Sequence, residues 1–290
     1  MLAMNKIVVP VDFSEGSAGA ARQAAALSRH FHSEVVLLHV QRPLNYAVGA
    51  LDGGYIGDLP EVIAEQGRKQ LDSFVEENFT GLHVRRVLVE GDPARRIVEF
   101  AHEESANLIV MPTHGYGPFR RFILGSVTAK VLHDAECPVW TGVHLEEPPA
   151  AQSMAIRSVL CAVDLTPHSR RTLCWAAQMA AEFGARLGIA HAAPALDMSG
   201  PGGRYFAPEW RSVLLAHAGE QIAKLQQDLG THAEVYVESG SASEVLRMTA
   251  EQAGADLLVI GRSPSGGIAG RLRTNAYALI RESPCAVVSV

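Results

Sequence analysis

Apolar residues follow two alternating patterns along the chain. Short runs in which nearly every position is apolar indicate strands buried on both faces. Between them lie longer segments whose apolar residues recur every three or four positions, as on one face of a helix, and Ser14 is placed to cap the first of these. In the first half the predicted strands are 7–11, 35–40, 83–89, 108–111 and 139–143, and the predicted helices follow Ser14 and cover 62–79, 94–103 and 127–134.

The pattern of the first half returns in the second. KIVVPVDFS near the start is repeated as SVLCAVDLT, which aligns Asp12 with Asp164. The same spacing aligns His39 with His191, and SANLIVMP is echoed by GADLLVIG. This self-similarity indicates an internal repeat, in which the same domain fold occurs twice in the chain. The predicted organisation is a first domain at 1–146, a proline-containing linker at 147–155 and a second domain at 156–290.

Strands alternating with helices of this length are connected by right-handed crossovers. The predicted fold class is therefore α/β, with two doubly wound, mainly parallel five-stranded sheets flanked by helices. In such sheets ligands bind beyond the carboxyl ends of the strands, where the winding direction reverses. Asp12 and the loop after 108–111 are expected at that edge, although Asp12 could equally anchor a turn or cap the following helix.

The segment at 107–128, NLIVMPTHGYGPFRRFILGSVT, joins a buried strand to a turn-rich loop and a helix. The N–H groups at a helix start carry a partial positive charge, so a phosphate could sit against Gly125, Ser126 and Val127. The neighbouring Arg120 and Arg121 reinforce that charge. This stretch is therefore the candidate anion site of the chain.

The same stretch resembles the phosphate loop of the universal stress proteins of the UspA type. ATP-binding members carry a glycine, two residues, a second glycine, nine residues and then Gly-Ser or Gly-Thr. The chain matches at Gly115, Gly125 and Ser126, while Pro112 stands where the first glycine is expected. A proline has a fixed φ and no N–H to donate, so it alters the backbone available to a ligand.

The resemblance implies an adenine nucleotide alpha hydrolase-like fold in which the two domains pack as a pseudo-two-fold pair. Single-domain members dimerise through the last strand, and both halves of this chain end on an apolar strand that invites pairing. A further homodimer is compatible with this arrangement. The resemblance also implies ATP, with Mg²⁺, as ligand of the first domain, contacted by Pro10, Val11, Asp12, Val40, Met111, Gly115, Arg120, Gly125, Ser126, Val127 and Thr128.

The second half has fewer of the loop residues that could bind a phosphate. Its interval between the fourth strand and the last strand is three residues shorter, and Pro264 stands in place of Gly115. Gly261 is kept, but Arg273-Thr274-Asn275 replaces the Gly-Ser pair. The second domain is therefore expected to retain the fold for architecture or to hold a different ligand.

Composition narrows the function classes. A hydrophobic fraction of 48% over 290 residues is ordinary for globular domains, and a net charge of −6 gives no basic face for nucleic acid. The start lacks a signal-peptide pattern and no apolar run approaches the ~18 residues of a membrane span, so a cytoplasmic protein with no membrane partner is expected. The four scattered cysteines are expected to be reduced, buried thiols: Cys137, Cys161, Cys174 and Cys285.

Catalytic and metal-binding motifs do not occur in the sequence. The histidines form no zinc-ligand spacing, and no GxSxG, Walker lysine or CxxC motif occurs. His39 and His191 are expected to be satisfied within the core, and His114 could donate to a phosphate or lie at a loop surface. The sequence predicts no metal site. It also predicts a protein that is not an enzyme and that hydrolyses ATP slowly at most.

The loops at 43–60 and 194–210 are long and rich in glycine. They could be lids, and their aromatic residues could contact a ligand or pack the loops down: Tyr46, Tyr55, Tyr205 and Trp210. The leading hypothesis is a tandem universal stress protein, a non-enzymatic stress-tolerance factor that binds an adenine nucleotide in its first domain. The alternative is a scaffold or regulator that binds no nucleotide and takes a protein or apolar small molecule through these loops.

Overall fold

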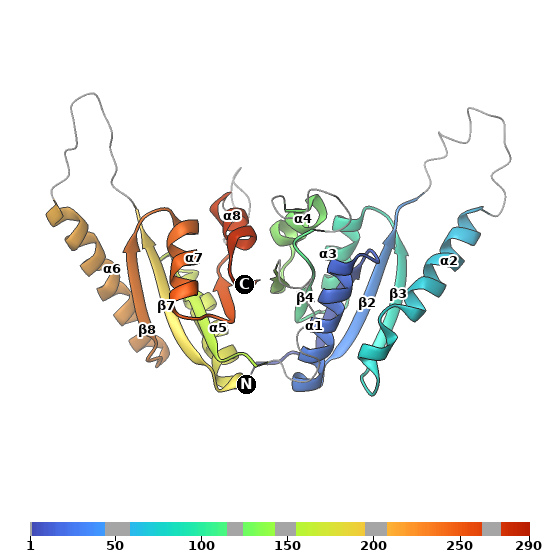
Figure 1. The fold of residues 1–290 in the computed structure, drawn as a ribbon, viewed down its shortest axis with the longest axis horizontal. Helices are drawn as coiled ribbons and strands as arrows, with labels where there is room; N and C mark the ends of the chain where they lie inside the picture. The colour runs from blue at the N-terminus through green and yellow to red at the C-terminus, as the bar shows by residue number, and fades with distance from the viewer. Residues whose placement is uncertain (1, 44–58, 115–123, 143–154, 195–207, 263–273) are drawn as a thin grey trace, which may run out of the picture. The chain divides into compact units, whose positions relative to one another are not determined.

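A computed structural model describes residues 2–43, 59–114, 124–142, 155–194, 208–262 and 274–290 of the chain. The chain divides into two compact units, Ala3–Met154 and Ala155–Val290. In both units strands lie side by side and are flanked by helices (Figure 1). Each unit is an α/β domain in its own right, which confirms the predicted fold class and the tandem arrangement.

The first unit has five parallel strands in the order β3-β2-β1-β4-β5. The chain winds outward from β1 to β3 and then returns to place β4 on the other side of β1, so the winding direction reverses between β1 and β4. Its elements are β1 (Lys6–Val11), α1 (Glu15–Phe31), β2 (Glu34–Gln41), α2 (Leu59–Ser73), the 3-10 turn η2 (Glu76–Phe79), β3 (Val84–Glu90), α3 (Pro93–Glu103), β4 (Leu108–Val110), α4 (Ser126–Asp134) and β5 (Val139–Thr141).

The second unit repeats this topology with the order β8-β7-β6-β9-β10, again parallel. Its winding direction reverses between β6 and β9. Its elements are β6 (Ser158–Ala162), α5 (Ser169–Phe183), β7 (Arg186–Ala193), α6 (Pro208–Leu229), β8 (Glu234–Ser239), α7 (Ala242–Gln252), β9 (Leu257–Ile260), α8 (Thr274–Glu282) and β10 (Ala286–Ser289).

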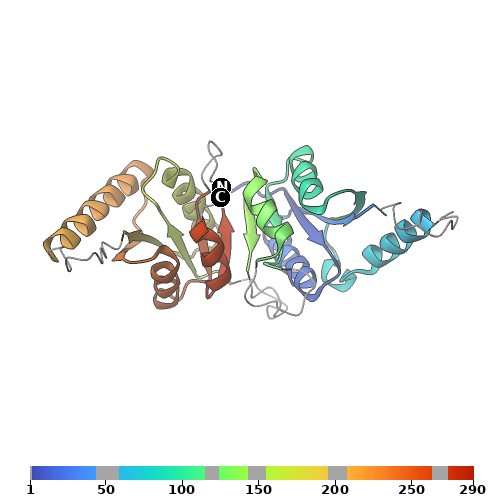
Figure 2. The ribbon, with the colours of Figure 1, turned by 90° about the horizontal axis from the view of Figure 1, so that it is seen from above.

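Right-handed crossovers distribute the helices over both faces of each sheet. In Figure 2 the blue α1 and the teal α3 lie on opposite sides of the strands of the first unit. Helix α1 packs through Ala20, Ala24 and Leu27, all fully buried, and Ser14 caps it by accepting a hydrogen bond from the Ser17 N–H, as predicted. The small alanine side chains let α1 lie close to the apolar surface of β1.

One polar residue fixes the start of the central strand in each unit. Asn107 Oδ1 accepts hydrogen bonds from the backbone N–H groups of Asn5 and Lys6, both at 2.9 Å. In the second unit Asp256 Oδ2 accepts from the N–H groups of Arg157 and Ser158, at 2.7 and 3.0 Å. Asn107 and Asp256, which occupy equivalent positions in the repeat, therefore make the same pair of hydrogen bonds to the start of the central strand.

The predicted helix at 62–79 is wrong over its last six residues, 74–79. Helix α2 ends at Ser73, Val75 adopts a left-handed conformation with φ of 44°, and η2 follows. Phe79 is buried and the Phe74 ring lies 5.6 Å from that of Phe13, so the packing of these aromatic side chains outweighs helical continuity.

Two further expectations change with the structure. Trp210 belongs to α6 rather than to a loop, and it is 61% exposed. Strand β5 ends at Thr141, two residues before the predicted end of the strand at 143. Tyr46, Tyr55 and Tyr205 lie outside the described residues.

Candidate functional site

The central strands of the first domain part at their carboxyl ends. The register joins Ile7 to Leu108 and Val8 to Ile109, whereas β1 continues beside β2 as far as Val11. Pro10 lies past the last β1–β4 pair, a position that suits a residue with no N–H to donate. This divergence coincides with the reversal of winding, where ligands of open α/β sheets bind.

Asp12 follows directly on β1 and holds the turn into α1. Its Oδ1 accepts hydrogen bonds from the Ser14 N–H, at 3.0 Å, and from the Ser14 hydroxyl. The Ser14 hydroxyl oxygen in turn accepts from the Ser17 N–H at 3.2 Å. The turn-anchoring role that the sequence left open is therefore present, and the side chain remains exposed at the carboxyl edge of the sheet.

Phe13 is a residue of this edge that sequence reasoning missed. Its φ of 63° turns its ring onto His39, with ring centroids 4.5 Å apart. His39 Nδ1 lies 2.7 Å from the Val11 carbonyl oxygen, and since a carbonyl only accepts, Nδ1 carries the proton. His191 makes the same bond to Val163 at 2.8 Å, so both histidines are hydrogen-bonded as expected, but both are half-buried rather than part of the core.

The start of α4 is tied to the end of β4 by two hydrogen bonds. The Gly125 N–H donates to the Thr113 carbonyl at 2.8 Å, and the buried Thr128 hydroxyl donates to the Pro112 carbonyl at 3.0 Å. Gly125 is the N-cap of α4 and makes no side-chain capping bond. Because a glycine has no side chain, the N-cap residue itself offers no acceptor to the backbone N–H groups of the first turn, from Ser126 onward.

Pro112 is buried and fills space above the first turn of α1. A Cβ added to Gly16 would lie 3.0 Å from Pro112 Cβ and 3.1 Å from the His114 carbonyl oxygen. The loop after β4 therefore rests directly on α1, and Gly16 leaves the room that the proline ring occupies. The proline that replaces the expected first glycine of the motif is thus accommodated because Gly16, its neighbour in α1, has no side chain.

Most of the implied nucleotide contacts fall at this one edge. Pro10, Val11 and Asp12 end β1, Val40 lies half-buried near the end of β2, and Met111 follows β4. Gly125, Ser126, Val127 and Thr128 begin α4. Gly115, Arg120 and Arg121 lie outside the described residues. His114 is half-buried, and its Nδ1 lies 3.0 Å from the Thr113 hydroxyl oxygen.

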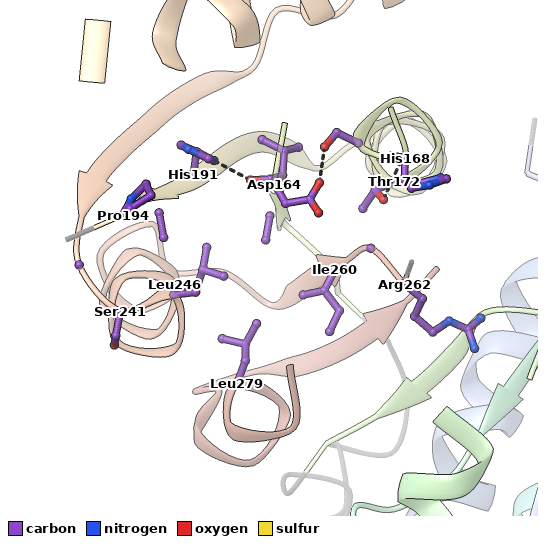
Figure 3. Close-up of a pocket in the computed structure, with 17 residues that line it drawn as sticks. Asp164, His168, Thr172, His191, Pro194, Ser241, Leu246, Ile260, Arg262 and Leu279 are labelled. Carbon is purple, nitrogen blue, oxygen red and sulfur yellow. Dashed lines mark hydrogen bonds between the residues drawn. The ribbon is translucent and has the colours of Figure 1, made fainter. Parts of the chain in front are cut away.

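The second domain contains a cavity of about 500 Å³ at the carboxyl ends of β6, β7 and β9 (Figure 3). Of its polar residues the sequence repeat had marked Asp164, as the counterpart of Asp12, and His191, which was expected to lie in the core. The spacing that aligns Asp12 with Asp164 would also have pointed to Ala192, at the position of Val40. The lining consists of Ala162, Val163, Asp164, His168, Ser169, Thr172, His191, Ala192, Pro194, Gly240, Ser241, Ala242, Leu246, Ile260, Gly261, Arg262 and Leu279.

The four cysteines are free thiols, but they are not all buried. Burial raises the pKa of the Cys161 thiol far above its ordinary value and that of Cys285 to about 11. Cys174 is exposed and Cys137 is half-buried, which corrects the expectation that all four are buried. Within the described ranges no three His, Cys, Asp or Glu side chains gather as a metal site, and no helix could span a membrane.

Both halves of the chain match the model of the Universal stress protein family, at residues 4–141 and 155–290. The chain belongs to the universal stress protein family. The family that the sequence motif resembled is thereby confirmed, and the two matches make this a tandem universal stress protein.

Related proteins agree with this assignment over one domain and over the whole chain. Universal stress protein MJ0531 of Methanocaldococcus jannaschii is 36% identical over 137 residues, which cover 46% of this chain and 79% of that protein. A universal stress protein of Mycolicibacterium smegmatis is 28% identical over 299 residues, covering 98% of this chain and 96% of that protein. The crystal structure of a universal stress protein from Archaeoglobus fulgidus shares the fold, with a TM-score of 0.70, 23% identity, and coverage of 99% and 98%.

Proposed function

We propose that this tandem universal stress protein binds ATP or another adenine nucleotide in its first domain and acts in stress tolerance without catalysing a reaction. The observation that carries the proposal is the start of α4. Its N-cap residue, Gly125, has no side chain that could occupy the first-turn N–H groups, and it is tied to the end of β4 through Thr113 and Pro112. Helix starts of this kind bind phosphate through backbone N–H groups.

The neighbouring residues supply the remaining chemistry of a nucleotide site. Val11 and Val40 would lie against the base, and the Asp12 carboxylate would accept a hydrogen bond from an amino group or a ribose hydroxyl. Phosphates would meet the N–H groups of Ser126 and Val127. Mg²⁺ would be held through the phosphates and water, as is usual for this ion.

Hydrolysis, in this proposal, is slow at most. A general base must reach the attacking water within hydrogen-bond distance. Asp12 is the candidate base, but its Oδ1 already accepts two hydrogen bonds from Ser14. We further propose a cytoplasmic location, in keeping with the four free thiols.

Calorimetric titration with Mg-ATP tests the proposal through Ser126→Asp. A carboxylate in the first turn of α4 stabilises the helix and repels a phosphate, so the fold should persist while ATP affinity falls by about tenfold or more. Ser126→Ala is the matched control and should bind like wild type. Equal ATP affinity in Ser126→Asp and Ser126→Ala would contradict the proposed phosphate position.

Variants of Gly125 test the proposal less cleanly. A Cβ at this position would lie 3.3 Å from His114 Cα and 3.4 Å from the Thr113 carbonyl oxygen. A larger side chain would therefore displace the loop whether or not a phosphate binds.

A second candidate function is the scaffold, favoured by one observation. Trp210 and Val213 at the start of α6 are 61% and 58% exposed, an apolar surface suited to a partner. Absence of both binding heat and thermal shift with every adenine nucleotide would favour this candidate over nucleotide binding.

A further inference from the structure

Helix α6 of the second domain carries apolar residues on two faces. Its inner face packs on β7, β8 and α5 and buries Ala218 and Ile222. On its outer side Trp210 and Val213 are 61% and 58% exposed. In Figures 1 and 2 none of the described helices and strands of the second unit lies beyond this outer side. A helix that covers a sheet ordinarily turns a polar face to water, so these apolar residues indicate a contact surface.

The exposed residues of the outer face recur at intervals of three and four. This spacing is typical of a helix that packs lengthwise against a second helix. A Cβ added at the neighbouring Gly219 would have no atom of the described residues within 4 Å, so the surface is open there. The residues with this spacing, which form the outer stripe of α6, are Val213, Ala216, Glu220, Ala223 and Gln227.

The corresponding helix of the first domain, α2, has a different outer face. Its exposed positions from Glu61 to Ser73 are polar apart from Val62. Lys69 Nζ lies 2.8 Å from Glu65 Oε1, an ion pair between residues four apart on a solvated helix. Both helices follow the second strand of their domain, so the fold itself does not require an apolar outer stripe. The stripe is therefore a property of the second domain alone.

Two opposite charges lie in the middle of α6. Glu220 and Lys224 are four residues apart and both are exposed. In α7 the equivalent spacing gives an ion pair, in which Arg247 Nη1 lies 2.6 Å from Glu251 Oε1. Neither Glu220 nor Lys224 forms an ion pair with any residue that the structure describes. Both charges are therefore available to a partner.

A second copy of the chain pairs both charges at once. We consider two α6 helices packed antiparallel about a two-fold axis at the level of Ile222. Glu220 of each copy then lies opposite Lys224 of the other, because both residues are two positions from the axis. Ala216 and Ala223 flank these pairs with short side chains, which lets the two helices come close. The charge pattern of α6 is thus complementary to itself.

The same axis brings exposed apolar residues together at the ends of the helix pair. Trp210 is twelve residues, or about 18 Å, from the axis, which is beyond Leu229 at the end of the second copy's α6. Gln226 Oε1 accepts a hydrogen bond from the Ala233 N–H at 2.6 Å, so the start of β8 is tied to the end of α6. Val235 in this part of β8 is 38% exposed. Trp210 of one copy therefore meets the region of Val235 in the other.

We propose that two copies of this chain associate through the outer stripe of α6, as an antiparallel helix pair. Trp210 and Val213 supply the apolar contact, since tryptophan is a frequent source of binding energy in interfaces. The reciprocal pairs of Glu220 with Lys224 fix the orientation and the register. This contact goes beyond the proposed nucleotide binding and does not depend on it. It is also separate from the pairing predicted for the last strands.

Sedimentation equilibrium of the intact chain without nucleotide, at a series of concentrations, tests the proposal. Wild type should associate to a dimer. Lys224→Glu should weaken the dimer at least about tenfold, because two carboxylates then face each other in both pairs. Combining Glu220→Lys with Lys224→Glu exchanges the charges, rebuilds both pairs and should restore most of the affinity. Lys69→Glu on α2 makes the same change in net charge and should associate like wild type.

Trp210→Ala tests the apolar part of the contact. It should weaken the dimer at least about tenfold, because the side chain that it removes is buried only in the dimer. Trp210 is exposed in the single chain, so the fold of the variant should persist. Circular dichroism of each variant checks this.

Three results would overturn the proposal. The first is a wild-type chain that stays monomeric at every concentration. The second is a dimer that neither Trp210→Ala nor Lys224→Glu weakens, which would place the contact elsewhere, for example at the last strands. The third is a loss in Lys224→Glu that the exchange of both charges does not recover. Failure of the nucleotide proposal is recognised separately, because Ser126→Asp tests ATP binding alone.

Discussion

Pro112 illustrates how a single residue is tolerated through its neighbours. Its ring lies against Gly16 in the first turn of α1, and its carbonyl accepts from Thr128 in α4. Both contacts use features that a proline retains, namely the ring and the carbonyl oxygen. Neither of these contacts uses a backbone N–H, so the N–H group that a proline lacks is not needed for them.

Gly16→Ala should destabilise the protein even though alanine is the better helix former. Propensity favours alanine by about 0.5–1 kcal/mol, but the new Cβ would lie 3.0 Å from Cβ of the buried Pro112, and overpacking typically costs 1–3 kcal/mol. Urea unfolding measures the difference. Pro112→Gly in the same chain should relieve part of the loss. A Gly16→Ala protein more stable than wild type would show that the loop moves aside freely.

Glu104 makes the first domain sensitive to acid. The Arg85 guanidinium, at 2.6 Å, and then the Lys6 ammonium, also at 2.6 Å, lower the pKa of Glu104 from 4.5 to about 2. A carboxylate whose pKa is lowered in the folded state contributes stability above its unfolded pKa. That stability is lost as the pH falls from about 4.5 towards 2.

Replacing Glu104 by glutamine should flatten this part of the pH profile. Glu104→Gln should be less stable than wild type at pH 7, and the gap should close as the pH falls to about 2. Urea unfolding at a series of pH values measures this difference in unfolding free energy. Glu103→Gln is the control, because Glu103 is the exposed last residue of α3 and directly precedes Glu104. A gap independent of pH would rule out the charge contacts as its cause.

At the scale of elements, Asn107 and Asp256 fix the starts of β1 and β6. Asn107→Ala removes the acceptor for the N–H groups of Asn5 and Lys6 and should cost about 1–3 kcal/mol of unfolding free energy. Asn107→Asp, the residue found in the second domain, keeps the acceptor and should lose much less. Urea unfolding distinguishes the two variants. Equal losses of unfolding free energy would contradict the stabilising role of the hydrogen bonds that Asn107 accepts.

Elements buried on both faces were predictable from the sequence, and those decided by tertiary packing were not. Leu108–Val110 was recognisable because every position is apolar and a proline follows. The end of α2 at Ser73 was not, because Phe74 turns towards Phe13, which lies in a loop far away in sequence. Helix periodicity carries no information on such a contact.

The candidate sites divide along the same lines. Gly125 could be named because the spacing of the glycines marks it, and Asp12 because it follows the first strand and recurs as Asp164. The cavity of the second domain could not, because its lining comes from five separate segments and includes residues as ordinary as Ala192, Pro194 and Leu279. Only the topology that brings the ends of β6, β7 and β9 together reveals it.

For the molecule as a whole, the two halves share one topology but differ in the residues at the carboxyl ends of their central strands. In the first domain α4 begins after Gly125, which has no capping side chain, and in the second a cavity lies at the carboxyl ends of β6, β7 and β9. Pairing of the domains through their last strands, and a further homodimer, stay predictions.

Photolabelling with 2-azido-ATP, followed by mass spectrometry of the digested chain, tests the central claim most directly. The account predicts that label protected by excess ATP falls on peptides of the first domain that contain Val11, Val40 or Met111, and that Ser126→Asp reduces it. Protected label confined to peptides with Asp164 or His191, or no protected label anywhere, would contradict it.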